Sequence, residues 1–304
     1  MGELPRGIVP VLQTPFDTGG AIDYESLARL IEDGLQAGAA GFLAPAVASE
    51  VETLSAAERT TLVPYVLGVL RGRAPLIVGC SAGTAAESAH WTATAARAGA
   101  QACLIAPPPA LRDDADQLLA FLREADSPLP LIVQDLDWTG PGLAVENLLR
   151  LRDALPCLAG VKVEAVPAGP KYTRVKRALG AGFHVSGGWA APQMIEALDR
   201  GVDAFIPETS MVRIYNAIWR HHRAGRRAEA VRVFRDLIPV LAFTNQELRL
   251  SIAFFKRLLV RKGIFATETM RLPAFAWDEF SERIADELMG VYLQLEGQTS
   301  PISG

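Results

Sequence analysis

The sequence has few residues of the kinds that bind metal ions or form disulfides. It contains four histidines and three cysteines among 304 residues. Cys80, Cys103 and Cys157 each fall inside a predicted strand, Cys157 as the first residue of the strand-like stretch 157–164, and their spacing matches no zinc site. An odd number of buried cysteines is typical of reduced packing residues in a cytoplasmic protein. We therefore expect a cytoplasmic location, no metal and no cofactor.

The histidines are poorly placed for catalysis or for binding a metal. His90, His221 and His222 fall on predicted helices, where a solvated side chain is the usual case. Only His184 lies on a predicted strand, near its start, so we expect a hydrogen-bonded core residue there. A Ser–His–Asp triad therefore has no histidine in the required place.

Long apolar runs and an excess of charge are also missing. Charges, glycines and prolines interrupt every apolar stretch before the roughly 18 residues that a membrane span requires. The opening residues MGELPRGIVP have neither the basic run nor the apolar core of a signal peptide. The net charge is −4, from 30 basic and 34 acidic residues, which gives no electrostatic basis for binding nucleic acid. We expect neither a membrane nor a nucleic acid as a partner.

Strand-like and helix-like segments do alternate regularly along the chain. The predicted strands are 7–12, 41–44, 75–80, 102–106, 129–135, 158–164, 183–187 and 203–207. The predicted helices begin near Asp23 and at a capping box of Ser55 and Glu58, and then span 84–98, 113–125, 144–154, 168–179, 190–200 and 210–224. No Gly-x-Gly-x-x-Gly turn follows a strand, which argues against a doubly wound sheet. Eight strand–helix units in roughly 220 residues predict a TIM (β/α)8 barrel.

The chain after the eighth unit is organised differently. Residues from about 226 to 293 contain three helical segments with no strand between them, and no linker-like stretch precedes them. We therefore predict a (β/α)8 barrel at residues 1–224 and a C-terminal three-helix extension at 225–304 that packs on the barrel.

Active sites of such barrels lie at the carboxyl ends of the strands. The strand ends here present Gln13, Thr14, Ala48, Ser49, Glu50, Ser81, the prolines 107–109, Gln134, Asp135, Lys162, Glu164, Ser186, Gly187, Gly188, Glu208 and Thr209.

Lys162 is the only lysine or arginine at these strand ends. Lys162 and Glu164 are two residues apart on one strand, so their side chains point to the same face. A lone amine among apolar residues is desolvated, which favours its neutral, nucleophilic form, whereas a neighbouring carboxylate favours the charged form. The alternative interpretation is a lysine that extends from a strand end to water.

Gly187 and Gly188 precede a predicted helix. Their backbone N–H groups could hold a carboxylate or phosphate, and a tight turn explains the two glycines equally well.

These residues resemble the class I Schiff-base lyases typified by dihydrodipicolinate synthase and N-acetylneuraminate lyase. The resemblance spans nearly the whole chain and includes Thr14-Pro15-Phe16, Glu50-x-x-x-Leu54-Ser55-x-x-Glu58, Gly160-Val161-Lys162, Ser186-Gly187 and the helical tail. It implies a barrel in which Lys162 forms a Schiff base with a 2-oxo acid. It also implies a homo-oligomer, either a dimer or a tetramer.

Several family positions differ in this chain. The family's Gly-Thr-Thr-Gly-Glu loop, which holds the substrate carboxylate, is Ala-Val-Ala-Ser-Glu at residues 46–50, so Ser49 is its one side-chain donor. The family's proton-relaying tyrosine is replaced by Gln134, whose amide cannot exchange a proton near neutral pH. The tyrosine lent by a neighbouring subunit and the arginine after the fifth strand have no counterpart. These differences argue against a dihydrodipicolinate synthase.

A subgroup of the family is a better match. Gln134-Asp135, the spacing of Lys162 and Glu164, and residues 246–256 resemble the 2-keto-3-deoxy-pentonate (L-2-keto-3-deoxyarabonate) dehydratase-like subgroup. That resemblance implies a dehydratase or aldolase of a 2-keto-3-deoxy sugar acid, with Glu164, and Asp135 second, as proton carriers. We expect catalysis by Lys162 and Glu164, and substrate contacts from Ala48, Ser49, Gln134, Asp135, Gly187, Gly188 and Ile206.

Two other functions remain open. One is a barrel that has lost turnover and binds a small carbonyl compound, which the altered loop and the missing tyrosines favour. The other keeps Lys162 but acts on an aromatic or less polar carbonyl substrate, because Val47, Ala48 and Trp138 stand where polar groups are expected.

Overall fold

The computed structural model describes residues 3–189 and 191–299. The first two residues of the predicted barrel, the first residue of the helix predicted at 190–200 and the last five residues of the predicted extension lie outside the described residues. Its centre is a parallel sheet in which the strands hydrogen-bond in the order β1-β8-β7-β6-β5-β4-β3-β2. The strands are β1 (Gly7–Ile8), β2 (Phe42–Leu43), β3 (Leu76–Gly79), β4 (Ala102–Ile105), β5 (Leu131–Asp137), β6 (Leu158–Ala165), β7 (His184–Gly187) and β8 (Ala204–Phe205).

Hydrogen bonds between the first and second strand segments close this sheet. Leu43 N donates to Pro10 O at 2.9 Å, and Leu12 N donates to Leu43 O at 3.0 Å. A parallel bridge also joins Val11 to Leu43. The predicted TIM barrel is confirmed.

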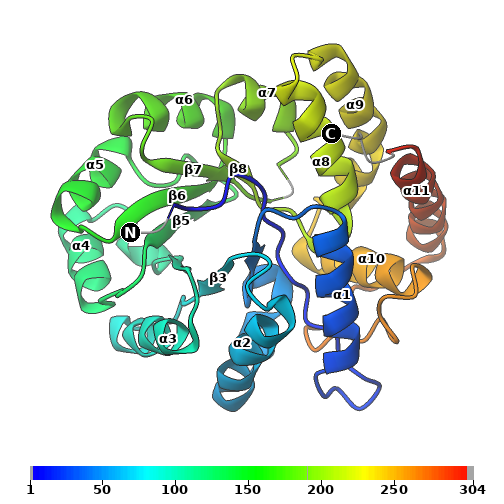
Figure 1. Cartoon of the computed structure of the whole chain (residues 1–304), viewed down its shortest axis with the longest axis horizontal. Coiled ribbons are helices and arrows are strands. Elements are labelled where there is room, and N and C mark those ends of the chain that lie inside the picture. The colour runs from blue at the N-terminus through cyan, green and yellow to red at the C-terminus, as the bar shows by residue number, and fades with distance from the viewer. Residues whose placement is uncertain (1–2, 190, 300–304) are drawn as a thin grey trace.

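A helix follows each strand, and these helices surround the barrel (Figure 1). They are α1 (Tyr24–Gln36), α2 (Ala56–Leu70), α3 (Ala85–Ala98), α4 (Ala115–Glu124), α5 (Val145–Ala154), α6 (Ala168–Leu179), α7 (Met194–Asp199) and α8 (Val212–Arg223). The seventh helix begins later than the predicted residue 190. Pro192 lies just before it, and a residue that precedes a proline is disfavoured in the helical conformation.

The first and last strands are shorter than predicted. Regular pairing in β1 ends at Ile8, and Pro10, which has no N–H to donate, follows two residues later. Similarly, β8 ends at Phe205, shortly before Pro207. Prolines thus limit the length of the regular hydrogen-bonded pairing between β1 and β8.

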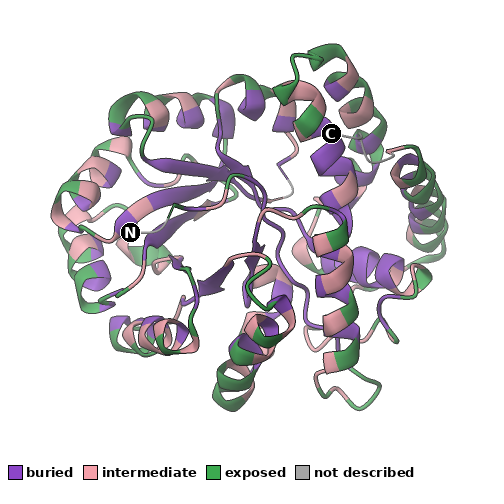
Figure 2. Cartoon of the chain, viewed as in Figure 1, coloured by how far each residue is buried: buried purple, intermediate pink, exposed green. Residues whose placement is uncertain are grey.

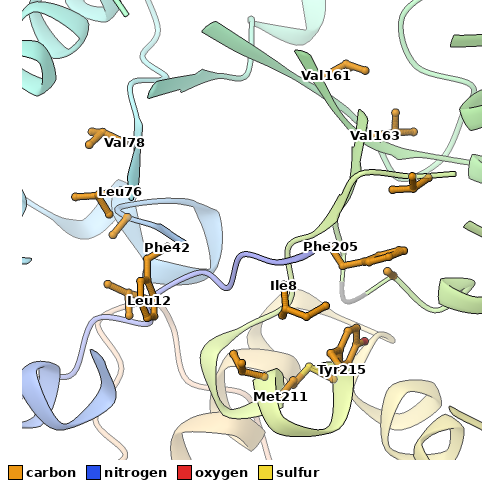
Figure 3. Close-up of a cluster of buried hydrophobic side chains, with 14 of the residues drawn as sticks. Ile8, Leu12, Phe42, Leu76, Val78, Val161, Val163, Phe205, Met211 and Tyr215 are labelled. Atoms are coloured by element: carbon orange, nitrogen blue, oxygen red, sulfur yellow. The ribbon is translucent and has the colours of Figure 1, made fainter. Parts of the chain in front are cut away.

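Side chains of the strands alternate between the barrel interior and the layer beneath the helices. One apolar cluster contains Val9, Val11, Leu43, Ile77, Leu104, Ile132 and Ile206. The other, between strands and helices, includes Ile8, Phe42, Val78, Val161, Val163 and Phe205 (Figure 3). Buried residues therefore concentrate in the strands and on the inner faces of the helices, and exposed residues lie on the outer helix faces (Figure 2).

The prediction that all three cysteines lie inside strands was partly wrong. Cys103 lies within β4, but Cys80 follows the last residue of β3 and Cys157 precedes the first residue of β6. Cys80 and Cys103 are buried, whereas Cys157 is half-buried, and all three are free thiols.

The C-terminal extension consists of α9 (Arg227–Thr244), α10 (Leu248–Arg261) and α11 (Glu279–Gln298). The proposed boundary at residues 224 and 225 falls in the turn between α8 and α9. In Figure 1 these helices lie along one side of the helix ring, where α9 contacts α8 and α11. None of the helices in the described residues is both long and apolar enough to cross a bilayer.

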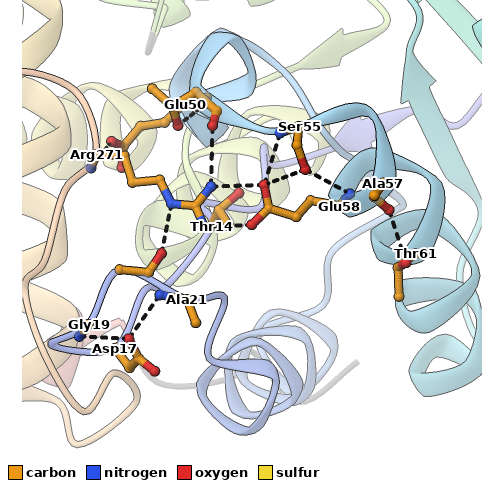
Figure 4. A network of polar contacts seen from close by, with 12 residues as sticks. Thr14, Asp17, Gly19, Ala21, Glu50, Ser55, Ala57, Glu58, Thr61 and Arg271 are labelled. Carbon is orange, nitrogen blue, oxygen red and sulfur yellow. Dashed lines mark hydrogen bonds and ion pairs between the residues drawn. The ribbon is translucent and has the colours of Figure 1, made fainter.

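Polar contacts of Lys256 and Arg271 connect this extension to the loop after β2 and to α2. Lys256 Nζ lies 2.5 Å from Glu50 Oε1, and neither side chain is exposed to solvent. Arg271, between α10 and α11, donates from Nη1 to Glu58 Oε2 at 2.9 Å and from its backbone N to Glu50 Oε2 at 2.7 Å (Figure 4). Glu58 also forms the predicted capping box with Ser55, so α2 and the C-terminal segment share one carboxylate.

Candidate active site

Lys162 and Glu164 lie near the carboxyl end of β6. They point to the face opposite Val161 and Val163, which pack beneath the helices. Lys162 Nζ lies 3.2 Å from Glu164 Oε1, and the two side chains are only 5% and 6% exposed. The two residues predicted to be catalytic are therefore buried and in direct contact.

The carboxylate of Glu164 is oriented by the neighbouring strand and loop. The backbone N–H of Trp189 donates to Oε1 at 2.7 Å, and the side-chain amide of Gln134 donates to Oε2. Gly188 allows the loop after β7 to approach this closely, because a Cβ there would overlap Glu164 Oε1 and lie 2.5 Å from Lys162 Cε. Gln134 thus positions Glu164. Gly188 also begins a turn, in which Ala191 N donates to Gly188 O at 2.9 Å, and its own N–H donates to Val163 O at 3.2 Å.

A cavity at this end of the barrel contains the pair. It has a free volume of about 70 Å³, room for a small molecule of a few non-hydrogen atoms. Its lining residues are Val11, Ala46, Val47, Ala48, Gln134, Trp138, Lys162, Glu164, Trp189, Ile206, Pro207, Glu208, Asn245, Leu248, Ser251 and Phe255. Of the expected substrate contacts, Ala48, Gln134 and Ile206 are in this set.

The chain has five lysines, and Lys162 is the one that lines this cavity. The other four make ion pairs elsewhere: Lys171 with Asp135, Lys176 with Asp203, Lys256 with Glu50, and Lys262 with Asp33 and Glu296. Schiff-base chemistry in this cavity would therefore depend on Lys162.

Asp135 does not join the site. It follows Gln134 on β5, so its side chain points to the opposite face, where it pairs with Lys171 of α6 and accepts a hydrogen bond from Leu143 N at 2.7 Å. Burial raises the pKa of Asp135 and lowers the pKa of Lys171, and their mutual attraction opposes both shifts. The expected role of Asp135 in proton transfer or substrate binding has no support in this geometry.

Ser49 and Gly187 are also not among the residues that line the cavity. Ser49 is fully buried; its hydroxyl donates to Leu12 O at 2.6 Å and accepts from Ala46 N at 3.0 Å. A Cβ on Gly187 would meet the hydroxyl of Tyr172 on α6 at 2.7 Å. Ser49 therefore shapes the loop after β2 instead of offering a free hydroxyl, and Gly187 provides room for Tyr172.

The backbone of that loop is available as a donor. Val47 and Ala48 begin the short 3-10 helix η1 (Val47–Ser49), and both line the cavity. Among the described residues, neither of their backbone N–H groups has a hydrogen-bond acceptor. These two groups could hold a substrate carboxylate where the family uses threonines as well.

Glu208 is a third carboxyl in the cavity, and it was not among the predicted site residues. It follows β8, where Ser210 N donates to its Oε2 at 3.1 Å and the Ser210 hydroxyl donates to Oε1. Burial raises the pKa of Glu208 to about 7, against these hydrogen bonds, which lower it. Its position at the carboxyl end of a strand could have identified it as a site residue. No such sequence rule identifies the lining residues that come from loops and α10, which are Trp189, Asn245, Leu248, Ser251 and Phe255.

The described residues contain no group of three or more His, Cys, Asp or Glu side chains that could hold a metal ion. His184 is buried at the other end of the barrel, in a second cavity that it shares with Arg6 and Phe183. Burial lowers the pKa of His184 to about 4, although Asp203 opposes the shift, so the ring is neutral at pH 7. The expected hydrogen bond of its ring is not among those of the described residues.

Comparison with known proteins agrees with the resemblance seen in the sequence. The model of the "Dihydrodipicolinate synthetase family" matches residues 4–289. The L-2-keto-3-deoxyarabonate dehydratase of Azospirillum brasilense is 27% identical over 276 residues, which cover 88% of this chain and 88% of that protein.

Matches to synthases of the family are shorter. The 4-hydroxy-tetrahydrodipicolinate synthase of Stutzerimonas stutzeri is 36% identical over 102 residues, 34% of this chain and 35% of that enzyme. The synthase of Pseudomonas putida is 31% identical over 159 residues, 51% of this chain and 54% of that enzyme. The matches thus span between a third and about half of the length of these curated relatives.

Solved structures share the fold of the whole chain. The 4-hydroxy-tetrahydrodipicolinate synthase of Methylacidiphilum fumariolicum superposes with a TM-score of 0.88 at 20% identity, covering 98% of both chains. A prophage protein of the dihydrodipicolinic acid synthase family from E. coli K12, in complex with pyruvate, has a TM-score of 0.84 at 20% identity and covers 96% of this chain and 98% of that one. From the extent of the family match and the shared barrel, this chain belongs to the dihydrodipicolinate synthetase family of lyases.

Proposed function

We propose that this protein is a Schiff-base-forming lyase of 2-oxo acids, in which Lys162 is the nucleophile and Glu164 carries protons. The observation that supports this most is the buried pair itself: one amine, 3.2 Å from one carboxylate, in a cavity at the catalytic end of the barrel. In so enclosed a site, transfer of a proton from Lys162 to Glu164 removes both charges and leaves a nucleophilic amine.

The expected chemistry begins with attack of Lys162 Nζ on C2 of the substrate. The carbonyl oxygen leaves as water, and C2 then carries an iminium that withdraws electrons from C3. In dehydration, Glu164 takes a proton from C3, the C4–O bond breaks, and the same proton leaves with the hydroxyl as water. In aldol cleavage, Glu164 takes the proton of the C4 hydroxyl and the C3–C4 bond breaks, which releases an aldehyde. After cleavage, the enamine that remains on Lys162 takes the proton back from Glu164 at C3. In both reactions, hydrolysis of the imine then restores Lys162.

The 2-keto-3-deoxy sugar acids are the first substrates to test. The similarity to the Azospirillum brasilense dehydratase extends over 88% of both chains. The resemblance to that subgroup lies in Gln134-Asp135, the spacing of Lys162 and Glu164, and residues 246–256. For a five-carbon acid, the alkene formed by dehydration isomerises to 2-oxoglutarate semialdehyde when a C5 proton moves to C3 and the resulting enol proton moves to C4. A screen of these acids with detection of 2-oxoglutarate semialdehyde therefore tests dehydration.

Borohydride trapping tests the role of Lys162. Incubation with pyruvate and sodium borohydride should add one reduced pyruvyl group per chain, and peptide mapping should place it on Lys162 and not on the other four lysines. Lys162→Ala should abolish the adduct, and Lys176→Arg, which keeps the charge opposite Asp203 outside the cavity, should not. No mass increase with any of a panel of 2-oxo acids would overturn the proposal.

A second candidate is a barrel that binds a carbonyl compound without turnover. It is favoured by the internal hydrogen bonds of Ser49 and by the absence of a tyrosine among the described residues that line the cavity. A 2-oxo acid that raises the melting temperature but leaves no reducible adduct would identify this function.

We also propose a cytoplasmic homo-oligomer, either a dimer or a tetramer. The proposal rests on the family resemblance, and sedimentation of the purified protein together with fractionation of cells tests it.

A further inference from the structure

Two tryptophans lie next to each other at the mouth of the candidate active site. Trp138 follows β5 and Trp189 follows β7, and their rings lie 5.7 Å apart between centroids at an angle of 33°. Both line the cavity that contains Lys162, and both also line an outer cavity of about 350 Å³ with Asn245, Leu248 and Ser251. The outer cavity therefore continues the inner one past the tryptophan pair.

Backbone and side-chain contacts order the two loops that carry these tryptophans. After Trp138, the chain turns around Asp137, which accepts a hydrogen bond from Gly142 N at 3.0 Å and pairs with Arg112 at 2.8 Å. Trp189 has a φ of 52°, a conformation that is strained for a bulky residue. Its N–H bond to Glu164 compensates for part of that strain. The strained residue thus connects the proton carrier to the mouth of the cavity.

The charges around the two cavities exclude a negatively charged distal group. Lys162 is the only lysine or arginine among the described residues that line either cavity, whereas Glu164, Glu208 and Glu247 are acidic. A distal phosphate or second carboxylate would therefore meet no cation beyond Lys162 and would approach carboxylates.

Several polar side chains that line the outer cavity are already hydrogen-bonded within the protein. The Thr244 hydroxyl donates to Val240 O, Asn245 Nδ2 donates to Trp189 O, and Gln246 Nε2 donates to Phe243 O. A hydroxylated substituent would lose hydrogen bonds to water and would compete with these internal hydrogen bonds for its partners. A planar apolar ring loses none and can contact the tryptophan rings.

We infer that the tryptophan pair forms a distal subsite for an uncharged aromatic ring on C4 of the 2-oxo acid. This inference rests on the proposed function and chooses among substrates of that chemistry. The favoured reaction is aldol cleavage: the C3–C4 bond breaks, the C4 hydroxyl proton passes to Glu164, and an aromatic aldehyde leaves. The electrons of the broken bond form an enamine on Lys162, which is protonated at C3 and hydrolysed to pyruvate.

Two substrates that differ only in the C4 substituent provide the test. We expect kcat/KM for 4-hydroxy-4-phenyl-2-oxobutanoate to exceed that for 4-hydroxy-2-oxopentanoate, which has a methyl group instead of the phenyl ring. Trp138→Ala and Trp189→Phe should each lower this ratio. The decrease should be roughly tenfold for Trp138→Ala, which removes the whole ring. Trp277→Ala, which removes a tryptophan outside both cavities, should leave the ratio unchanged. A ratio that Trp138→Ala does not alter, or a wild-type preference for the methyl compound or for a hydroxylated sugar acid, would overturn the inference.

A binding experiment separates this inference from the Schiff-base proposal. In Lys162→Ala, which cannot form an adduct, tryptophan fluorescence should be quenched by 4-phenyl-2-oxobutanoate at lower concentrations than by 2-oxobutanoate. Equal affinity for the two ligands counts against the subsite whether or not wild-type protein forms an adduct. A missing adduct in wild type with preferential phenyl binding would refute the lysine chemistry and retain the subsite.

Discussion

Glu164 Oε1 lies 3.2 Å from Lys162 Nζ and also accepts the backbone N–H of Trp189 at 2.7 Å. One carboxylate oxygen therefore connects the proposed nucleophile on β6 to the loop after β7. This arrangement allows Glu164 to exchange a proton with Lys162 and, once the amine is in a Schiff base, with the substrate. Proton transfer and adduct formation should consequently be separable by mutation.

Glu164→Gln should slow proton transfer at C3 much more than it reduces trapping of the adduct. An amide cannot accept the proton, and loss of a positioned base typically costs about 10²- to 10⁴-fold. Exchange of the C3 protons of pyruvate with deuterium oxide, followed by NMR, measures the first step, and borohydride trapping measures the second. Glu124→Gln, at an exposed position on α4, is the control. Unchanged deuterium exchange in Glu164→Gln would assign the base elsewhere.

Gly188→Ala should impair both the site and the fold. A Cβ there would overlap Glu164 Oε1 and approach Lys162 Cε to 2.5 Å, and overpacking of this kind costs about 1–3 kcal/mol. Gly182→Ala is the matched control, because a Cβ at that exposed glycine meets nothing within 4 Å. Urea unfolding and the yield of pyruvate adduct report the two effects; wild-type values for both in Gly188→Ala would contradict the close approach.

Lys256→Met should destabilise the protein by about 3–5 kcal/mol, since it leaves Glu50 buried without its cation. The two side chains are 2.5 Å apart and 0% exposed. The double substitution Glu50→Gln with Lys256→Met should regain part of the loss, because no buried charge then remains unpaired. Denaturant unfolding of the two variants and wild type checks this; a double variant less stable than Lys256→Met would argue against the charge-based account.

Glu208→Gln should change how stability depends on pH. Burial raises the pKa of Glu208 from 4.5 to about 7, so the folded state retains this proton at a pH where the unfolded chain has released it. The resulting stabilisation is complete below about pH 4.5 and is lost as the pH rises through about 7. Glutamine cannot ionise, so the variant should gain stability relative to wild type across that window, on the order of 3 kcal/mol at most.

Thermal unfolding at pH 5 and pH 8 measures the effect at Glu208. The difference between variant and wild type should be larger at pH 8, and the exposed control Glu124→Gln should show no such trend. An equal difference at the two pH values would mean that Glu208 is ionised throughout.

The sequence was sufficient to predict the barrel and the position of Lys162 at a strand end. Both follow from local rules: strand–helix alternation imposes parallel pairing, and period-two alternation places Lys162 and Glu164 on one face at a strand end. The same rule shows that Gln134 and Asp135, as consecutive residues, cannot both face the interior. It does not say which of them does, because that depends on the register of β5 against β6, in which Gln134 pairs with Lys162.

Only the tertiary structure decided what surrounds the amine. Trp189 and Glu208 reach the cavity from loops, and Leu248 and Phe255 reach it from α10, far along the chain from Lys162. Ser49 was expected to bind substrate and is instead bonded to Leu12 O, a carbonyl of the adjoining segment. Side-chain chemistry and strand periodicity are local properties that the sequence carries, whereas contacts between loops and the C-terminal helices arise from packing the whole chain.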